Sequence, residues 1–189
     1  SDLHERVVML KSDRMNGSRT ETYVAICFIS LILVCSIGPA EDWPNWRGPR
    51  HDGTWNAPDF PQDWKPDQTQ LRWKKTIGGG YGGIAVVGNQ LYLMDRLKPA
   101  EGEEKSTERE RILCYRASDG EFIWQHEYHV EYGTLGYGNG PRSTPTVADG
   151  RVYAFGALGH TFCLDAQTGN VIWSKDPQTD FEVQLPEWG

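Results

Sequence analysis

The 189-residue chain is acidic, with a formal net charge of −7 at pH 7. No basic stripe runs along it, and this argues against a nucleic-acid partner. The chain holds 21 glycines, 11 prolines and 8 tryptophans, and helix-type periodicity is hard to find after residue 40. This balance predicts an all-β fold with many turns.

An apolar run near the N-terminus predicts export. Tyr23–Ile37 contains no charged residue and follows two arginines, but it is shorter than the roughly 20 residues of a typical membrane span. A basic start, an apolar centre and a final small residue are typical of a signal peptide. We interpret residues 1–40 as a signal peptide cleaved after Ala40, with an uncleaved anchor at residues 23–40 as the alternative. Either way, we expect the rest of the chain to be periplasmic or otherwise extracytoplasmic, touching a membrane only through this segment.

Residues 41–74 are predicted to form a lead-in to the main fold. Glu41–Trp55 (EDWPNWRGPRHDGTW) is rich in tryptophan, glycine and proline. One interpretation is a ligand contact made by its charged residues, which are Arg47, Arg50, His51 and Asp52. The interpretation we favour is an ordered segment that packs its tryptophans on the first structural unit that follows it.

Gly78–Gly83 (GGGYGG) contains a formal G-x-G-x-x-G match. A dinucleotide site of this type requires a helix directly afterwards, so that the helix N-terminus can hold the pyrophosphate. The residues that follow, Ile84–Val87, read as a strand instead. We therefore interpret the glycines as positions where the chain passes close to other backbone on its way between structural units.

Two later segments are similar to each other. Ile112–Trp124 and Thr161–Trp173 both alternate short β-branched and aromatic runs with glycine turns, which is typical of an antiparallel meander. They align at a constant offset of 49 residues, and the matched pairs are Cys114 with Cys163, Ala117 with Ala166, Gly120 with Gly169, and Trp124 with Trp173. An earlier tryptophan, Trp73, ends a comparable run. Self-similarity at this period predicts a propeller of four-stranded blades.

The repeated motif also resembles a known family. Ala166-Gln167-Thr168-Gly169 followed by Trp173, and more loosely Ala117-Ser118-Asp119-Gly120 followed by Trp124, resembles the PQQ-like repeat. Quinoprotein alcohol dehydrogenases carry this repeat, and so does the lipoprotein scaffold of the outer-membrane β-barrel assembly machinery. The resemblance implies a β-propeller of four-stranded antiparallel blades, in which the repeat tryptophan lies between neighbouring blades. Residues 75–189 would supply about two blades, so we expect the chain to be the N-terminal part of a longer propeller.

Cys114 and Cys163 hold equivalent positions in the two repeats. Equivalent points on neighbouring blades should lie farther apart than the roughly 7 Å Cα separation that a disulfide allows. We therefore expect two buried single thiols.

The resemblance implies two functions. The first is a platform that binds a ligand or a protein partner, and the second is a PQQ-dependent oxidoreductase of the polyvinyl-alcohol or alcohol dehydrogenase type. PQQ with calcium would be the cofactor of the second, and most of its active residues would lie beyond Gly189. We favour the platform and assign no catalytic residue, because the sequence shows no vicinal Cys-Cys pair, no C-x-x-C-H and no carboxylate cluster suited to calcium.

Tyr128–Pro145 is the loop best suited to a flat anionic ligand. Tyr132 and Tyr137 are candidates for stacking on such a ligand, and Arg142 for pairing with its carboxylate. The alternative is a tight crossover between blades, in which Arg142 bonds to backbone carbonyls. His126 and His129 form an H-x-x-H pair without an apparent third ligand, so no metal site is assigned.

Overall fold

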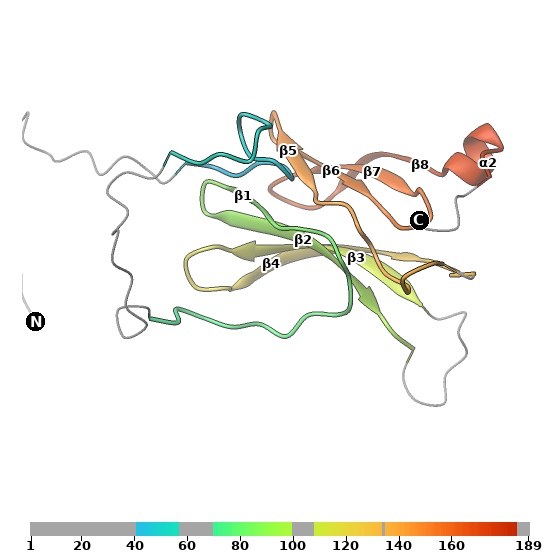
Figure 1. Cartoon of the computed structure of the whole chain (residues 1–189), viewed down its shortest axis with the longest axis horizontal. Coiled ribbons are helices and arrows are strands. Elements are labelled where there is room, and N and C mark those ends of the chain that lie inside the picture. Colours follow the sequence, from blue (N-terminus) through green and yellow to red (C-terminus); the bar gives the residue numbers. More distant parts are fainter. Residues whose placement is uncertain (1–40, 57–69, 100–107, 134, 185–189) are drawn as a thin grey trace, which may run out of the picture. The chain divides into compact units, whose positions relative to one another are not determined.

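A computed structural model describes residues 41–56, 70–99, 108–133 and 135–184 of the chain. Within these residues it contains two four-stranded antiparallel sheets, each with its strands in chain order (Figure 1). The first comprises β1 (Ala85–Val87), β2 (Gln90–Leu97), β3 (Arg109–Arg116) and β4 (Phe122–His129). The second comprises β5 (Thr146–Ala148), β6 (Arg151–Phe155), β7 (Thr161–Asp165) and β8 (Val171–Lys175), and the short helix α2 (Pro177–Phe181) follows it.

We call these sheets the first blade and the second blade. They confirm the predicted all-β fold of about two four-stranded antiparallel blades. They do not close into a ring. The segment assigned to export, residues 1–40, lies outside the described residues. None of the helices that the structure describes has the length and apolar character needed to span a bilayer.

The last two strands of each blade share the same register around the repeated cysteine and tryptophan. Cys114 pairs with Trp124 across β3 and β4, and Cys163 pairs with Trp173 across β7 and β8. The register shifts at the same place in both, directly after the cysteine. The predicted 49-residue repeat is therefore confirmed down to the position of a β-bulge. Both cysteines are buried and unpaired, as expected.

The tryptophan that ends the first blade packs against the second. Trp124 is only 7% exposed, and its indole N–H donates to the carbonyl of Ala166 at 3.0 Å. A Cβ atom placed on Gly169 would lie 2.5 Å from the Trp124 ring, and Gly169 has a φ of +73°. Glycine is therefore required at this turn for two reasons, its backbone conformation and the ring above it.

The same contact occurs one repeat earlier. The indole N–H of Trp73 donates to the carbonyl of Ala117 at 2.9 Å, and its ring lies 2.7 Å from where a Cβ of Gly120 would stand. Trp173 occupies the third equivalent position and is 41% exposed. The described residues supply no third turn against which Trp173 could pack.

The glycine-rich segment before β1 runs beside the crossover between the blades. Tyr81 donates its backbone N–H to the carbonyl of Pro141 at 2.8 Å. A Cβ on Gly82 would lie 2.3 Å from the carbonyl oxygen of Ser143, and one on Gly78 would lie 2.1 Å from that of Arg96. The interpretation that these glycines allow a close backbone passage is confirmed at both positions.

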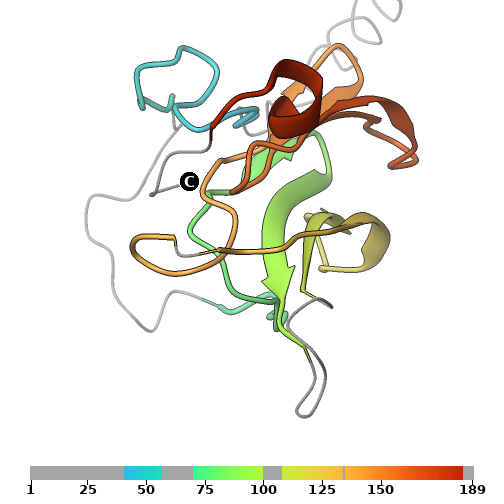
Figure 2. The same ribbon diagram turned by 90° about the vertical axis from the view of Figure 1, so that its right-hand side faces the viewer.

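The lead-in connects the two blades. Trp43 forms a two-bond antiparallel bridge with Val86 beside β1, and the carbonyl of Pro44 accepts from the N–H of Val147 in β5 at 2.8 Å. Figure 2 shows this blue segment next to the second blade. The expectation that the lead-in packs its tryptophans on the first blade is wrong for Trp46, which is 74% exposed. The Trp43 ring packs on Gly48 of its own loop, because the loop turns back on itself.

We expect Gly169→Ala to destabilise the protein more than Gly150→Ala. Both glycines have φ of +71° to +73°, but nothing lies within 4 Å of a Cβ on Gly150, whereas one on Gly169 meets the Trp124 ring. The left-handed backbone alone costs about 1–2 kcal/mol, and the steric conflict should add about 1–3 kcal/mol at Gly169. Urea unfolding of both variants gives the comparison. Equal losses would show that the ring contact contributes nothing.

Candidate functional site

Arg142, the predicted carboxylate partner, lies at the centre of a cage of backbone carbonyls. Its guanidinium donates at 2.7–2.9 Å to three of them, those of Gly136, Gly138 and Gly140. It also lies over the ring of Tyr81, 5.4 Å from the centroid. Gly138 and Gly140 have positive φ, which turns the loop around the side chain. The structure therefore has the bonding pattern of the crossover alternative.

Tyr137, a predicted stacking residue, stands at the outer tip of this loop. Its side chain is 92% exposed, and its φ of +65° is uncommon for a residue other than glycine. The backbone carbonyl of Tyr137 accepts from the hydroxyl of Tyr81 at 2.7 Å. The loop tip is thus tied down through its backbone, while the Tyr137 ring faces solvent.

Tyr132, the other predicted stacking residue, binds a buried carboxylate. Glu110 in β3 is fully buried and accepts hydrogen bonds from the hydroxyls of Tyr132 and Tyr128. The N–H of Ala157 in the second blade donates to the same carboxylate at 3.3 and 3.4 Å. Burial, reinforced by Glu110, raises the pKa of both tyrosines well above the usual range. Glu110 therefore links the first blade, the crossover and the second blade.

The three residues proposed for cofactor binding consequently do not converge. Tyr132 points to Glu110, Arg142 to the loop carbonyls, and Tyr137 to solvent. Their part in binding a cofactor stays a prediction. Within the described ranges, no group of three or more His, Cys, Asp or Glu side chains is placed to hold a metal ion. His126 instead packs on the ring of Phe162 at 4.7 Å, and burial lowers its pKa.

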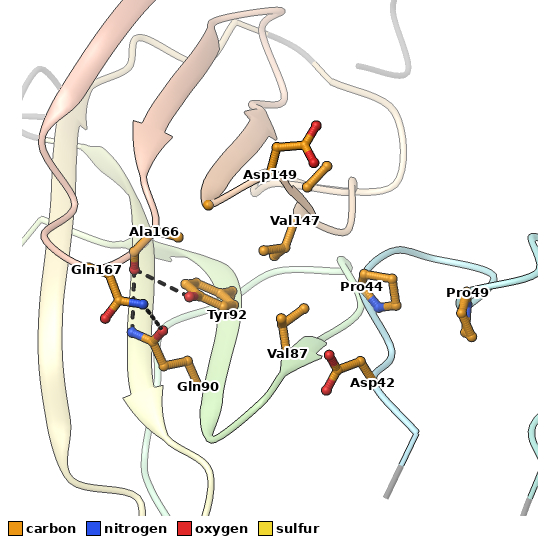
Figure 3. Close-up of a pocket in the computed structure, with 12 residues that line it drawn as sticks. Asp42, Pro44, Pro49, Val87, Gln90, Tyr92, Val147, Asp149, Ala166 and Gln167 are labelled. Atoms are coloured by element: carbon orange, nitrogen blue, oxygen red, sulfur yellow. Dashed lines mark hydrogen bonds between the residues drawn. The ribbon is translucent and has the colours of Figure 1, made fainter. Parts of the chain in front are cut away.

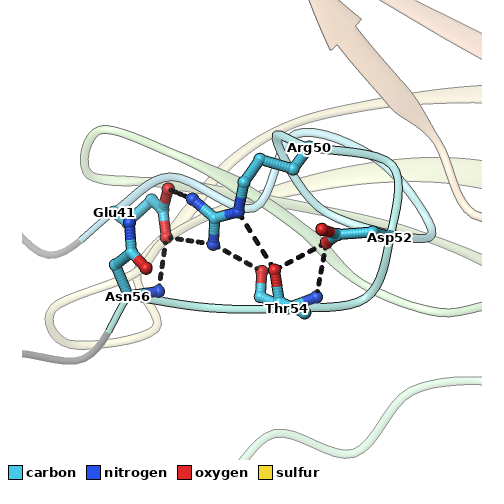
Figure 4. Close-up of polar contacts among 5 residues, drawn as sticks. All are labelled: Glu41, Arg50, Asp52, Thr54 and Asn56. Carbon is cyan, nitrogen blue, oxygen red and sulfur yellow. Dashed lines mark hydrogen bonds and ion pairs between the residues drawn. The ribbon is translucent and has the colours of Figure 1, made fainter.

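The charged residues of the lead-in are largely engaged with one another (Figure 4). Arg50 donates to the carboxylate of Glu41 at 2.6 and 3.2 Å, and to the hydroxyl and carbonyl of Thr54. Asp52 accepts from the N–H and hydroxyl of Thr54, and Glu41 accepts from the N–H of Asn56. The bond to Arg50 lowers the pKa of Glu41. These bonds close the loop from residue 41 to residue 56. Arg50 and Asp52 therefore stabilise the conformation of this loop.

A cavity that sequence reasoning missed lies where the lead-in meets both blades (Figure 3). Its volume is about 400 Å³, and its apolar walls include Pro44, Val87, Tyr92 and Val147. At its floor the Tyr92 hydroxyl donates to the carbonyl of Ala166 at 3.3 Å, and Gln167 donates to Gln90 at 3.1 Å. The walls come from segments up to 125 residues apart in sequence (42 to 167). No local motif signals such a cavity, because its residues otherwise read as turns and strand ends.

Comparison with known proteins gives partial matches. No protein-family model matches the chain. A quinohemoprotein alcohol dehydrogenase, ADH-IIG from Pseudomonas putida, is 44% identical over 41 residues, which is 22% of this chain and 6% of that protein. The chain therefore spans only a small part of its curated relative.

Solved structures also give partial matches. BamB from Moraxella catarrhalis is 20% identical over 55% of this chain and 26% of its own, with a TM-score of 0.35. A europium-containing methanol dehydrogenase is 21% identical over 57% of this chain and 18% of its own, with a TM-score of 0.40. The solved structure of ADHIIG from Pseudomonas putida HK5 is 20% identical over 50% of this chain and 13% of its own, with a TM-score of 0.34.

We expect alkaline pH to destabilise the protein through its buried tyrosines. A folded-state pKa above the unfolded value keeps the proton on the folded state, while the unfolded chain releases it near pH 10. Stability from these tyrosines is thus full below pH 10 and falls as the pH rises above it, by up to about 1.4 kcal/mol per pH unit for each proton.

Unfolding free energies between pH 9 and pH 11.5 test this expectation. Tyr128→Phe should make the fall of the unfolding free energy with pH less steep, by the contribution of about one proton, because it removes one of the protons that the folded state retains. Tyr137→Phe is the matched control, since it removes the hydroxyl of a ring that faces solvent. Identical slopes for the wild type and Tyr128→Phe would contradict a buried, protonated Tyr128.

Proposed function

We propose that this chain is part of an exported β-propeller that serves as a platform for binding a ligand or a protein partner. The observation that carries the proposal is the cage around Arg142. The cation expected to hold a quinone carboxylate donates instead to three backbone carbonyls of its own loop. A guanidinium engaged in this way stabilises the crossover between blades and leaves few donors for a ligand.

Two surfaces remain open among the described residues, the edge of the second blade and the cavity beside the lead-in. Every residue of β8 is exposed, and this edge strand presents Val171, Ile172 and Trp173. An exposed strand edge with apolar side chains is a surface that another sheet or peptide can cover. In a longer propeller the next blade would cover this flank, and the cavity beside the lead-in is available to a small molecule.

A PQQ-dependent oxidoreductase is the second candidate. The match to the quinohemoprotein alcohol dehydrogenase, 44% identical over 41 residues, favours it. In this case PQQ with calcium would supply the redox chemistry, and Arg142, Tyr132 and Tyr137 would contribute to holding it. The described geometry does not fit that role directly. Arg142 would have to release carbonyl partners, and Tyr132 would have to leave Glu110.

One titration separates the two functions. The full-length protein and its Arg142→Ala variant are titrated with PQQ plus calcium, and both are then melted without ligand. The platform predicts no quinone binding by the wild type and a lower melting temperature for Arg142→Ala. Arg72→Ala, which removes an exposed arginine, controls for the loss of charge.

The oxidoreductase predicts a different pattern. Wild-type protein would bind PQQ, and Arg142→Ala would weaken binding by roughly tenfold to a hundredfold, since a charge-assisted hydrogen bond contributes about 1.5–3 kcal/mol. That result, with an unchanged melting temperature, would overturn the platform proposal.

A further inference from the structure

The charged side chains that line the cavity beside the lead-in are all acidic. Two carboxylates line it, one from Asp42 in the lead-in and one from Asp149 in the turn between β5 and β6. In Figure 3 they lie on opposite sides of Val87 and Val147. The other polar side chains of the lining, Gln90 and Gln167, are neutral, and no lysine, arginine or histidine is among the residues that line it.

Both aspartates are exposed, and they are positioned by different means, Asp42 through its side chain and Asp149 through its backbone. Asp42 accepts from the backbone N–H of Gly88 at 2.7 Å, which leaves its second oxygen for another donor. Asp149 has a φ of +50° and is followed by Gly150 at +71°, the pair of left-handed residues that a tight hairpin requires. The neighbouring Arg151 hydrogen-bonds to Tyr153 and also interacts electrostatically with Asp149, but it is not part of the lining. The negative charge at the cavity therefore has no cation within the lining.

The apolar part of the cavity is built into the fold. Tyr92 is almost fully buried, and its hydroxyl is fixed on the Ala166 carbonyl that also receives the Trp124 indole. Pro44 is held by its bond to Val147. A volume of about 400 Å³ lies within the range of small-molecule sites, roughly 300–1,000 Å³. Such a site accepts a compact apolar body without rearrangement of the blades.

We propose that this cavity binds a small organic amine, with its apolar body against Pro44, Val87 and Val147 and its ammonium group attracted by the negative charges of Asp42 and Asp149. Apolar walls favour the body of the ligand through burial. Two carboxylates in a lining without a cation favour a protonated amine and disfavour an anion. The inference rests on the binding-platform function and names the ligand class of one site on it.

The test uses three probes of one shape that differ in charge. Phenethylamine, 2-phenylethanol and 3-phenylpropionate are titrated separately into the full-length, isotope-labelled protein, and amide shifts of Gly88, Val147 and Gly150 are followed by NMR. We expect phenethylamine to bind about tenfold more tightly than the alcohol, as one charge-assisted hydrogen bond would give. The carboxylate should cause no saturable shift. Raising the salt concentration should weaken the amine and leave the alcohol unchanged.

Isosteric variants assign the effect to the two carboxylates. Asp42→Asn keeps an oxygen for the Gly88 N–H, and Asp149→Asn keeps a side chain that tolerates the left-handed backbone. Each should weaken phenethylamine by roughly fivefold to tenfold without affecting the alcohol. Glu121→Gln removes one negative charge from the first blade, away from the cavity lining, and should have no effect.

Each outcome decides the proposal. Equal affinity for the amine and the alcohol, or amine binding that survives both Asp→Asn changes, would overturn it. Absence of any saturable shift with phenethylamine would do the same. If the quinone titration still shows no binding while the amine fails, the platform function stands and only the ligand class is wrong. Quinone binding would instead remove the function on which the inference rests, whatever the amine does.

Discussion

The contact between a tryptophan ring and the glycine turn of the following repeat is the constraint on which this structure depends. Trp124 covers Gly169, and its indole N–H binds the Ala166 carbonyl. The same carbonyl accepts from the Tyr92 hydroxyl and the Gln90 amide, so one turn of the second blade is fixed by three side chains of the first. A large flat ring over a residue without a side chain buries apolar area, and the indole donor sets its orientation.

This contact also determines what else can form between the blades. It positions Tyr92 as the floor of the cavity and brings β5 to the place where the lead-in can bond to it. At another point, Glu110 ties the first blade to Ala157 of the second through a fully buried carboxylate. Apolar docking at one place and a polar network at the other hold the two blades, while the loop around Arg142 stiffens the crossover. In this account the residues that first suggest a cofactor site act mainly as connectors.

Much of the fold could be predicted from the sequence, because its signals are local. Alternation of β-branched residues, glycine turns and a fixed repeat of Cys, Gly and Trp locate the strands and their register. The contacts of the candidate site residues could be predicted less well from the sequence. Whether Arg142 binds a ligand or the carbonyls of its own loop depends on the backbone conformation of residues 136–140. Tyr128 and Tyr132 share one partner, Glu110, which lies 18 and 22 residues away in the sequence. The outward position of Trp46 and the cavity depend on segments brought together only by the tertiary structure.

Hydrogen exchange of the tryptophan indoles tests the central contact most directly. In labelled full-length protein, the Nε1–H of Trp124 is bonded and buried, whereas Trp46 in the lead-in is 74% exposed. We expect the indole proton of Trp124 to exchange orders of magnitude more slowly than that of Trp46, with Trp73 also protected. Comparable exchange rates at Trp124 and Trp46 would contradict the claim that this contact holds the blades together.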